Sequence, residues 1–156
     1  MSEAPQIGGV PMPPSAVMMG WRLISIDAEA GEMEVGFEGK PEFRNPAGYV
    51  QGGIIAAMMD DAMGPLLVAH TGGRKYPSTI DLHTHYLRPV PVGPVTVKAR
   101  VVRLGRQIAF LEAELFERSG KLAARGRASA ALIEGIFGKG DRVPAGDETA
   151  EEKTDG

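Results

Sequence analysis

The stretch IIAAMMDDAMGPLLVA, residues 54–69, decides the fold of this chain. It is apolar on almost every face of a helix, and its only polar residues are Asp60 and Asp61. The length of the stretch and its many Ala and Met residues favour a helix over a strand. A helix of this composition must be buried nearly all round. We therefore expect a buried helix over residues 53–71.

Alternating runs on both sides of this helix predict an antiparallel sheet. Residues 21–26 and 32–37 come before it and predict a short hairpin. Four longer runs follow it and predict a meander of strands joined by short turns, over residues 77–87, 93–104, 107–118 and 121–134. A single sheet covers an apolar helix only if it wraps around it, so the expected fold class is α+β, an antiparallel sheet around one long central helix.

The face of the sheet that is turned away from the helix must meet solvent or a partner subunit. We expect the large apolar residues Val101 and Phe116 on that face. Exposed apolar residues of this size favour an oligomer.

The composition predicts one soluble globular domain, with 43% hydrophobic and 24% charged residues. We expect a proline-rich, irregular leader over residues 1–15 and an ordered domain over residues 16–137. Residues 138–156 are rich in acidic residues, Gly and Thr, and predict a disordered tail. Six acids against two bases in residues 141–156 leave the rest of the chain with 15 basic and 14 acidic residues, close to neutral.

Charge and composition also exclude several classes of function. A nearly neutral body gives no electrostatic footprint for duplex nucleic acid. The first twenty residues do not have the pattern of a signal peptide, and no stretch approaches eighteen consecutive apolar residues, so we expect a cytoplasmic protein without a membrane partner. Because the chain has no cysteine, disulfides, thiolate metal sites and a cysteine nucleophile are excluded.

The start of the helix carries groups that suit chemistry at a carbonyl. Gly52 and Gly53 let a ligand approach bare backbone, where unpaired amides and the helix dipole favour a developing oxyanion. Burying the charge of Asp60 within an apolar helix costs free energy unless the carboxylate is hydrogen-bonded or functional. The helix pattern alone leaves a structural role and a functional role equally open. Asp61 lies about 100° further round the helix and is expected to be structural.

Residues 45–64, NPAGYVQGGIIAAMMDDAMG, resemble the hotdog thioesterases of the phenylacetate-degradation type. That family has an asparagine, a histidine six residues later followed by Gly-Gly, and an aspartate after six further residues. In this chain those places are taken by Asn45, Gln51, Gly52, Gly53 and Asp60. The segments STIDLHTHYLRP (78–89) and VRLGRQ (102–107) look like the family's central strand and next hairpin, so that the resemblance spans roughly residues 17–134.

The resemblance implies a hotdog fold and hydrolysis of an acyl-CoA with an aryl or medium-chain acyl group. Asp60 would be the general base or the nucleophile, and the Gly52 amide would bind the oxyanion. Thr79 stands where relatives carry serine or threonine and could orient the water or the carboxylate. No metal or prosthetic group is implied, since coenzyme A is part of the substrate.

The resemblance also implies a homodimer or a homotetramer, with sites shared between subunits. Asn45, Gln51 and Gly52 of one subunit would face Asp60 and Thr79 of the other. Gln51 departs from the family histidine: an amide can donate a hydrogen bond but cannot titrate. Asn45 precedes a proline and is equally typical of a turn.

Further contacts with the substrate are expected from the helix and from strand ends. Gly53 and Met63 could border an acyl or aryl pocket, although core packing is an alternative for Met63. Three arginines could either contact the phosphates of coenzyme A or be solvated surface charges: Arg88, Arg103 and Arg106. One strand carries Asp81, His83 and His85 on one face, which is more typical of a polar sheet surface than of a metal site.

Two other functions compete with hydrolysis. A noncatalytic module that binds or senses acyl-CoA would share the scaffold, but it would have no need of Asp60. A hotdog dehydratase is disfavoured because the helix lacks the histidine that those enzymes use as their acid/base group.

Overall fold

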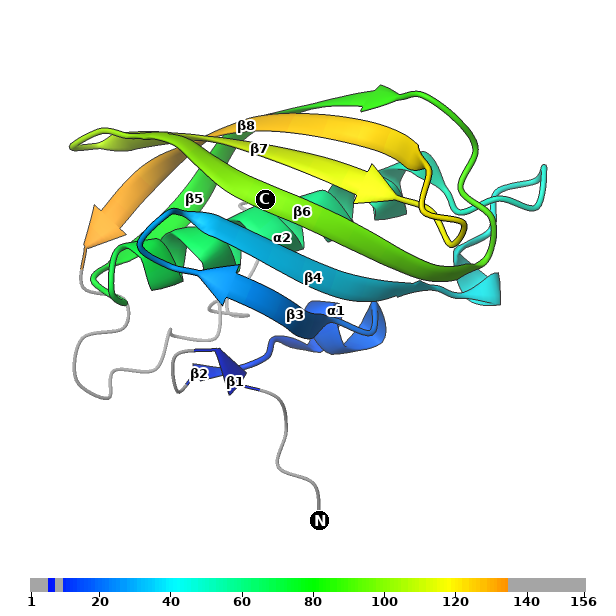
Figure 1. Cartoon of the computed structure of the whole chain (residues 1–156), viewed down its shortest axis with the longest axis horizontal. Helices are drawn as coiled ribbons and strands as arrows, with labels where there is room; N and C mark the ends of the chain where they lie inside the picture. The colour runs from blue at the N-terminus through cyan, green and yellow to red at the C-terminus, as the bar shows by residue number, and fades with distance from the viewer. Residues whose placement is uncertain (1–5, 8–9, 135–156) are drawn as a thin grey trace, which may run out of the picture.

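A six-stranded antiparallel sheet forms the body of the protein in a computed structural model that describes residues 6–7 and 10–134 (Figure 1). Its strands are β3 (Arg22–Asp27), β4 (Glu32–Gly39), β5 (Lys75–Tyr86), β6 (Gly93–Leu104), β7 (Ile108–Phe116) and β8 (Leu122–Glu134). Their spatial order is β3-β4-β6-β7-β8-β5. The sheet curves around the long helix α2 (Gly52–His70), and the short 3-10 helix η1 (Pro41–Phe43) lies in the connection between β4 and α2. The expected antiparallel sheet around one central helix is confirmed.

The position of β5 differs from the predicted meander. β5 pairs with β8, from Lys75↔Glu134 to Tyr86↔Ala124, and β6 pairs with β4 instead. The connection over residues 87–92 contains two prolines and is too long for a tight hairpin turn, so it can carry the chain across the sheet. The predicted hairpin β3–β4 and the order β6–β7–β8 are confirmed.

One face of α2 forms the core together with the concave side of the sheet. Its buried residues recur at intervals of three and four: Ile55, Met58, Met59, Ala62, Met63, Leu66 and Leu67. They pack against inward-facing residues such as Val35 and Val97. By length and composition alone α2 could cross a membrane, but here it is the core helix of the sheet.

The opposite face of α2 is only partly covered. Asp60, Asp61, Gly64, Pro65 and Val68 lie there and line a cavity. The prediction that the helix is buried nearly all round is therefore wrong for the single chain. This uncovered face of α2 carries both of its acids beside apolar residues.

The segment before β3 holds more structure than the irregular leader that its prolines predict. The two-residue strands β1 (Gln6–Ile7) and β2 (Val10–Pro11) pair with each other, and helix α1 (Pro14–Met18) begins with a proline at its first position, where proline is favoured. Ala16 in the middle of α1, and Met19 and Trp21 after it, belong to the core. Residues 1–5, 8–9 and 135–156, including the predicted acidic tail, lie outside the described residues.

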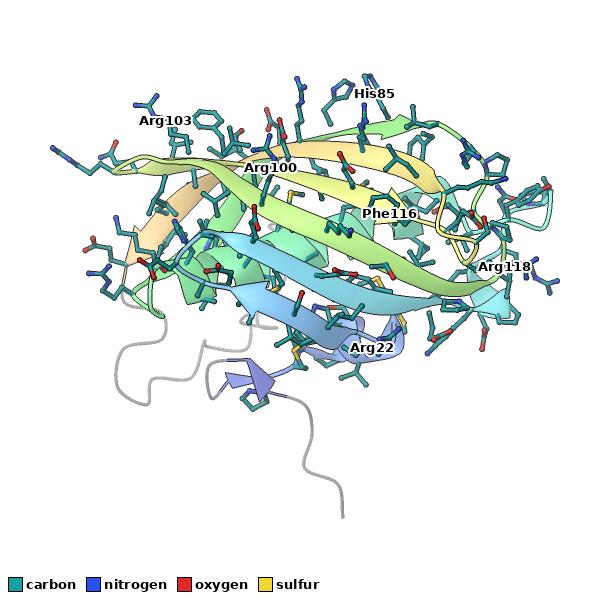
Figure 2. The ribbon with its side chains drawn as sticks, viewed as in Figure 1. Arg22, His85, Arg100, Arg103, Phe116 and Arg118 are labelled. Carbon is teal, nitrogen blue, oxygen red and sulfur yellow. The ribbon has the colours of Figure 1, made fainter. Side chains whose placement is uncertain are left out.

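The outer face of the sheet is more polar than expected. Val101 turns inward against the core, because residues 95, 97, 99 and 101 alternate toward the helix, so its predicted place on the outer face is wrong. Phe116 does lie on the outer face, with the Lys98 ammonium 5.2 Å from its ring centroid (Figure 2). Cross-strand ion pairs of Glu112 with Arg100 and Arg127 also lie on this face.

Candidate active site

Gln51 caps the start of α2. Its side-chain Oε1 accepts a hydrogen bond from the Ile54 amide at 3.1 Å. The amides of Gly52 and Gly53, the first two helical residues, have no acceptor within the helix, and the helix dipole makes this end partly positive. Because Oε1 is engaged in the cap, the side-chain amide nitrogen is the donor that Gln51 can offer a ligand.

Tyr86, at the end of β5, closes over the first glycine. Its hydroxyl donates to the Gly52 carbonyl at 2.6 Å, and a Cβ added at Gly52 would lie 3.2 Å from the Tyr86 Cζ. A Cβ at Gly53 would lie 2.8 Å from the Gln51 Oε1. The Gly-Gly pair therefore makes room for these two side chains. Sequence reasoning missed Tyr86, although it lies in the quoted segment of residues 78–89.

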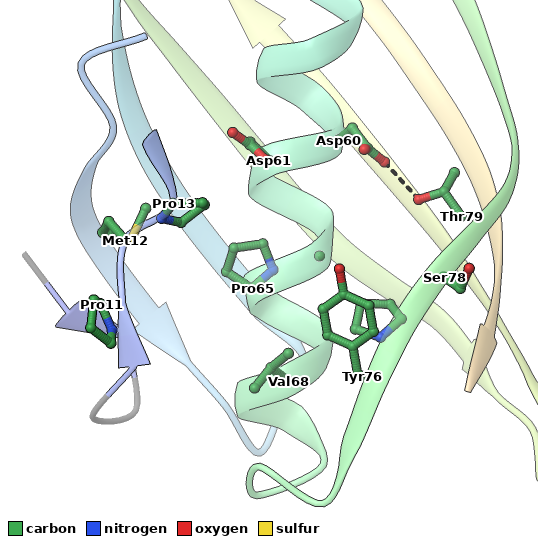
Figure 3. Close-up of a pocket in the computed structure, with 12 residues that line it drawn as sticks. Pro11, Met12, Pro13, Asp60, Asp61, Pro65, Val68, Tyr76, Ser78 and Thr79 are labelled. Atoms are coloured by element: carbon green, nitrogen blue, oxygen red, sulfur yellow. Dashed lines mark hydrogen bonds between the residues drawn. The ribbon is translucent and has the colours of Figure 1, made fainter. Parts of the chain in front are cut away.

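Asp60 and Thr79 come together on the open side of α2. The Thr79 hydroxyl donates to the Asp60 Oδ1 at 2.9 Å (Figure 3). A bulge in β5 between Thr79 and Asp81 makes this possible, since a bulge re-aims side chains. Thr79 points to the helix, whereas Asp81, only two residues on, accepts from the Ser129 hydroxyl at 2.6 Å on the outer face.

Asp61 lines the same cavity as Asp60, although the two residues lie about 100° apart around the helix. Its backbone carbonyl accepts a hydrogen bond from the Trp21 indole at 3.0 Å, which is a structural contact. Its carboxylate Oδ2, however, is buried and has no hydrogen-bond partner among the residues that the structure describes. Burial, and to a lesser extent the charge of Asp60, raises the pKa of the Asp61 carboxyl from 3.8 to about 6.

This raised pKa makes stability depend on pH. In the unfolded chain the carboxyl ionises near its ordinary pKa, so the stability that protonated Asp61 contributes is lost as the pH rises towards 6. At pH 8 we expect Asp61→Asn to raise the free energy of unfolding by about 1–2 kcal/mol, after discounting for solvent screening. At pH 4 the gain should be about 0.5 kcal/mol or less. Urea unfolding at both pH values measures this, and an equal effect at both would contradict it.

A cavity of about 430 Å³ lies between the open face of α2, the first residues of β5 and the segment before α1 (Figure 3). Asp60, Asp61 and Thr79 are among the residues that line it. The structure places Met63 elsewhere: its side chain is 2% exposed and lies in the core, so it does not border this cavity as expected. Met63 lies on the face of the helix that packs against the sheet, so its side chain does not reach the cavity.

Gly52 and Asp60 of one chain are too far apart to act on one thioester. They are separated by eight residues of α2, or about 12 Å along the helix axis. An oxyanion donor and a base must both lie about 3 Å from the reacting group. A site that uses both residues therefore needs two copies of the chain.

Four other predicted site residues lie apart from Asp60. Asn45 Oδ1 accepts from the amides of Ala47 and Tyr49, at 3.0 and 3.1 Å, which gives it a role in the turn. Arg88 follows the end of β5, whereas Arg106 lies beside its start, where the Arg106 carbonyl accepts from the Lys75 ammonium. Arg103 lies near the same hairpin tip as Arg106 (Figure 2).

These arginines do not form one phosphate site within a chain. The twelve residues of β5 separate Arg88 from Arg106 by roughly 40 Å at strand geometry. The three arginines of one chain therefore cannot all contact one coenzyme A, and contact of each with a phosphate stays a prediction. The sequence placed these arginines at strand ends, but it could not show which strand ends lie close together in space.

The two strand histidines form a contact with each other. The rings of His83 and His85 are 4.6 Å apart, edge to face. In the described part of the chain, no three His, Cys, Asp or Glu residues are grouped so that they could hold a metal.

Comparisons with known proteins agree with this architecture. The family model "Thioesterase superfamily" matches residues 47–124. A Sulfurisphaera tokodaii protein named for a proposed esterase activity is 34% identical over 98 residues, which cover 63% of this chain and 72% of that protein. A similarly named Saccharolobus solfataricus protein is 31% identical over 100 residues, 64% of this chain and 71% of that protein.

Solved structures show the same arrangement. A proposed thioesterase from Ralstonia eutropha JMP134, related to phenylacetic acid degradation, has a TM-score of 0.75 and 35% identity, covering 80% of this chain and 93% of that one. The E. coli PaaI protein, from the phenylacetic acid degradation operon, has a TM-score of 0.70 at 22% identity, covering 77% and 82%, and supports the fold alone. The chain belongs to the thioesterase superfamily, and its sheet wrapped around α2 is the hotdog fold of PaaI-like thioesterases.

Proposed function

We propose that this thioesterase hydrolyses an acyl-CoA with an aryl or medium-chain acyl group. The observation that carries the proposal is the place of Asp60, on the open face of a mostly apolar helix, bonded to Thr79 and at the wall of the cavity. A half-exposed carboxylate that is held at a cavity wall by a hydroxyl can reach a bound ligand and act as a base. The names of the relatives, which refer to esterases and to phenylacetic acid degradation, support the class of substrate.

Asp60 is suited to act as the base. Thr79 holds Oδ1, which leaves Oδ2 to accept a proton from a water molecule. The water oxygen bonds to the thioester carbonyl carbon, and the carbonyl oxygen becomes an oxyanion. When the intermediate collapses, the carbon–sulfur bond breaks, the free acid forms and the thiolate of coenzyme A takes up the proton from Asp60. Direct attack by Asp60, with hydrolysis of the resulting anhydride, is the alternative route.

The Gly52 amide is suited to stabilise the oxyanion. It stands at the positive end of α2 without an acceptor within the helix. Losing one such donor typically costs about 3 kcal/mol of transition-state stabilisation. Gln51 adds a side-chain amide donor beside it, in the place where relatives have histidine.

Each site would be shared by two subunits of a homodimer or homotetramer. The roughly 12 Å spacing between Gly52 and Asp60 supports an arrangement in which Gly52, with Gln51 and Asn45, comes from one subunit and Asp60, with Thr79, from the other. The outer edge of β5 is unpaired within the described sheet, and Ile80 on it is 57% exposed, so this edge suits pairing with a second copy. We further propose a cytoplasmic location, with no resident cofactor or metal and no nucleic acid or membrane partner.

A thiol-release assay tests the activity. The protein is incubated with a panel of acyl-CoA thioesters, and free coenzyme A is followed with a disulfide reagent. The chain has no cysteine and adds no background signal. We expect release from aryl or medium-chain thioesters. Binding of acyl-CoA without release from any member of the panel would contradict hydrolysis and leave the noncatalytic binding module.

A further inference from the structure

The cavity beside Asp60 is elongated along α2. Asp60 and Thr79 lie towards one end, and Val68 lies at the other, eight residues or about 12 Å further along the helix. A group attached to a thioester carbonyl at Asp60 can extend into this space. The cavity volume of about 430 Å³ is within the usual range of ligand pockets, roughly 300–1,000 Å³, and is enough for a medium-sized acyl group.

Residues 11–13 form a wall on one side of α2, and β5 with Thr79 lies on the other side, so that the open face of the helix lies between them (Figure 3). Pro11 pairs with Gln6 in the β1–β2 ladder, and the Pro13 carbonyl accepts from the Val17 amide at 3.1 Å. The wall is therefore held on both sides of Met12. The Met12 side chain is 9% exposed and belongs to the core cluster. A flexible thioether adapts its shape to a neighbouring apolar group.

The chemistry of the lining selects one part of the substrate. No lysine or arginine is among the described residues of the cavity wall, so coenzyme A phosphates have no counter-charge there. The charged groups that do line it, Asp60 and Asp61, disfavour an acyl group that ends in a carboxylate. Pro65, Val68 and Tyr76 provide apolar surface instead.

We propose that Met12 determines acyl specificity, because an uncharged medium-chain acyl group extends from Asp60 across the open face of α2 and ends against the wall that Met12 forms. This inference rests on the proposed function, and it adds a residue from a segment outside the thioesterase family match. A larger side chain at this position shortens the space, and a smaller one lengthens it.

Substrate ratios test the proposal. In Met12→Trp we expect kcat/KM for octanoyl-CoA, relative to that for acetyl-CoA, to fall at least about tenfold, and in Met12→Ala the preferred chain to become longer. The matched control is Met18→Trp, because Met18 lies on α1 with its side chain 52% exposed and outside the cavity. Equal ratios in Met12→Trp and Met18→Trp would overturn the proposal, as would adipyl-CoA being hydrolysed as well as hexanoyl-CoA.

A variant on the helix side of the cavity and a binding measurement provide two further tests. Val68→Phe narrows the same cavity from the helix side and should lower the same ratio, even if Met12→Trp does not fold. Calorimetric binding of S-octyl-CoA, a thioether that cannot be hydrolysed, needs no turnover. Loss of its binding in Met12→Trp or Val68→Phe, with S-ethyl-CoA still bound, would support the cavity even if the wild-type protein hydrolysed nothing. Equal binding of S-octyl-CoA by wild type and both variants would overturn it.

Discussion

Asp60→Asn is expected to lower kcat on an acyl-CoA by about 10²–10⁴-fold, the usual contribution of a positioned base. Asparagine has nearly the same shape, and its side-chain oxygen can still accept the hydrogen bond from Thr79. It cannot accept a proton from water, nor attack the thioester as a carboxylate does. Steady-state kinetics should therefore show a fall in kcat with KM changed much less.

The matched control for this variant lies two residues beyond Thr79. Asp81→Asn makes the same chemical change on the outer face of β5, where the carboxylate bonds Ser129 instead of facing the cavity. We expect its kcat to stay within about twofold of the wild-type value, as for a surface change away from the site. Circular dichroism and urea unfolding would check that both variants fold. If Asp60→Asn kept the activity of Asp81→Asn, Asp60 would be neither base nor nucleophile.

Local patterns predicted the elements of the fold but not the order of the sheet. The composition of residues 54–69 left few alternatives to a core helix, and alternation located the long strands. Alternation is a property of one strand, however, and does not say which strand lies beside it. The connection over residues 87–92 therefore had to be seen in space before β5 could be placed beside β8. The sequence also did not show which faces of the helix are covered, because this depends on the elements that pack on each side.

The candidate site was predictable where its residues lie on one short motif. Asp60 and Gly52 could be identified because helix burial and helix-end chemistry are readable from consecutive residues. Thr79 was identified only through the family resemblance, since its contact with Asp60 depends on a bulge. Tyr86 and Met12 come to the site from segments more than thirty residues from their partners, and the proline-rich stretch around Met12 has no periodicity that could reveal a cavity wall.

Gly52→Pro replaces the amide hydrogen of the proposed oxyanion site by the carbon of a proline ring. Gly52 is the first residue of α2, where proline is favoured, and Gln51 has φ −62° and ψ 138°, a conformation allowed before proline. We expect kcat to fall by about 10²–10³-fold because the amide donor is lost. Gly52→Ala is the matched control, because it adds a Cβ against Tyr86 but keeps the amide. An equal loss in both variants would assign the effect to crowding instead of the missing donor.

Hybrid dimers of these two inactive variants should recover activity. If Gly52 and Asp60 of each site come from different subunits, a dimer of one Asp60→Asn chain and one Gly52→Pro chain has one site with both defects and one intact site. With two different affinity tags the hybrid can be purified, and its kcat per dimer should reach about half of the wild-type value, because a two-fold symmetric dimer has two equivalent sites. If each site lay within one chain, every site of the hybrid would carry one defect and activity would stay near that of the parent variants. The roughly 12 Å between Gly52 and Asp60 along α2 makes the first outcome the expected one.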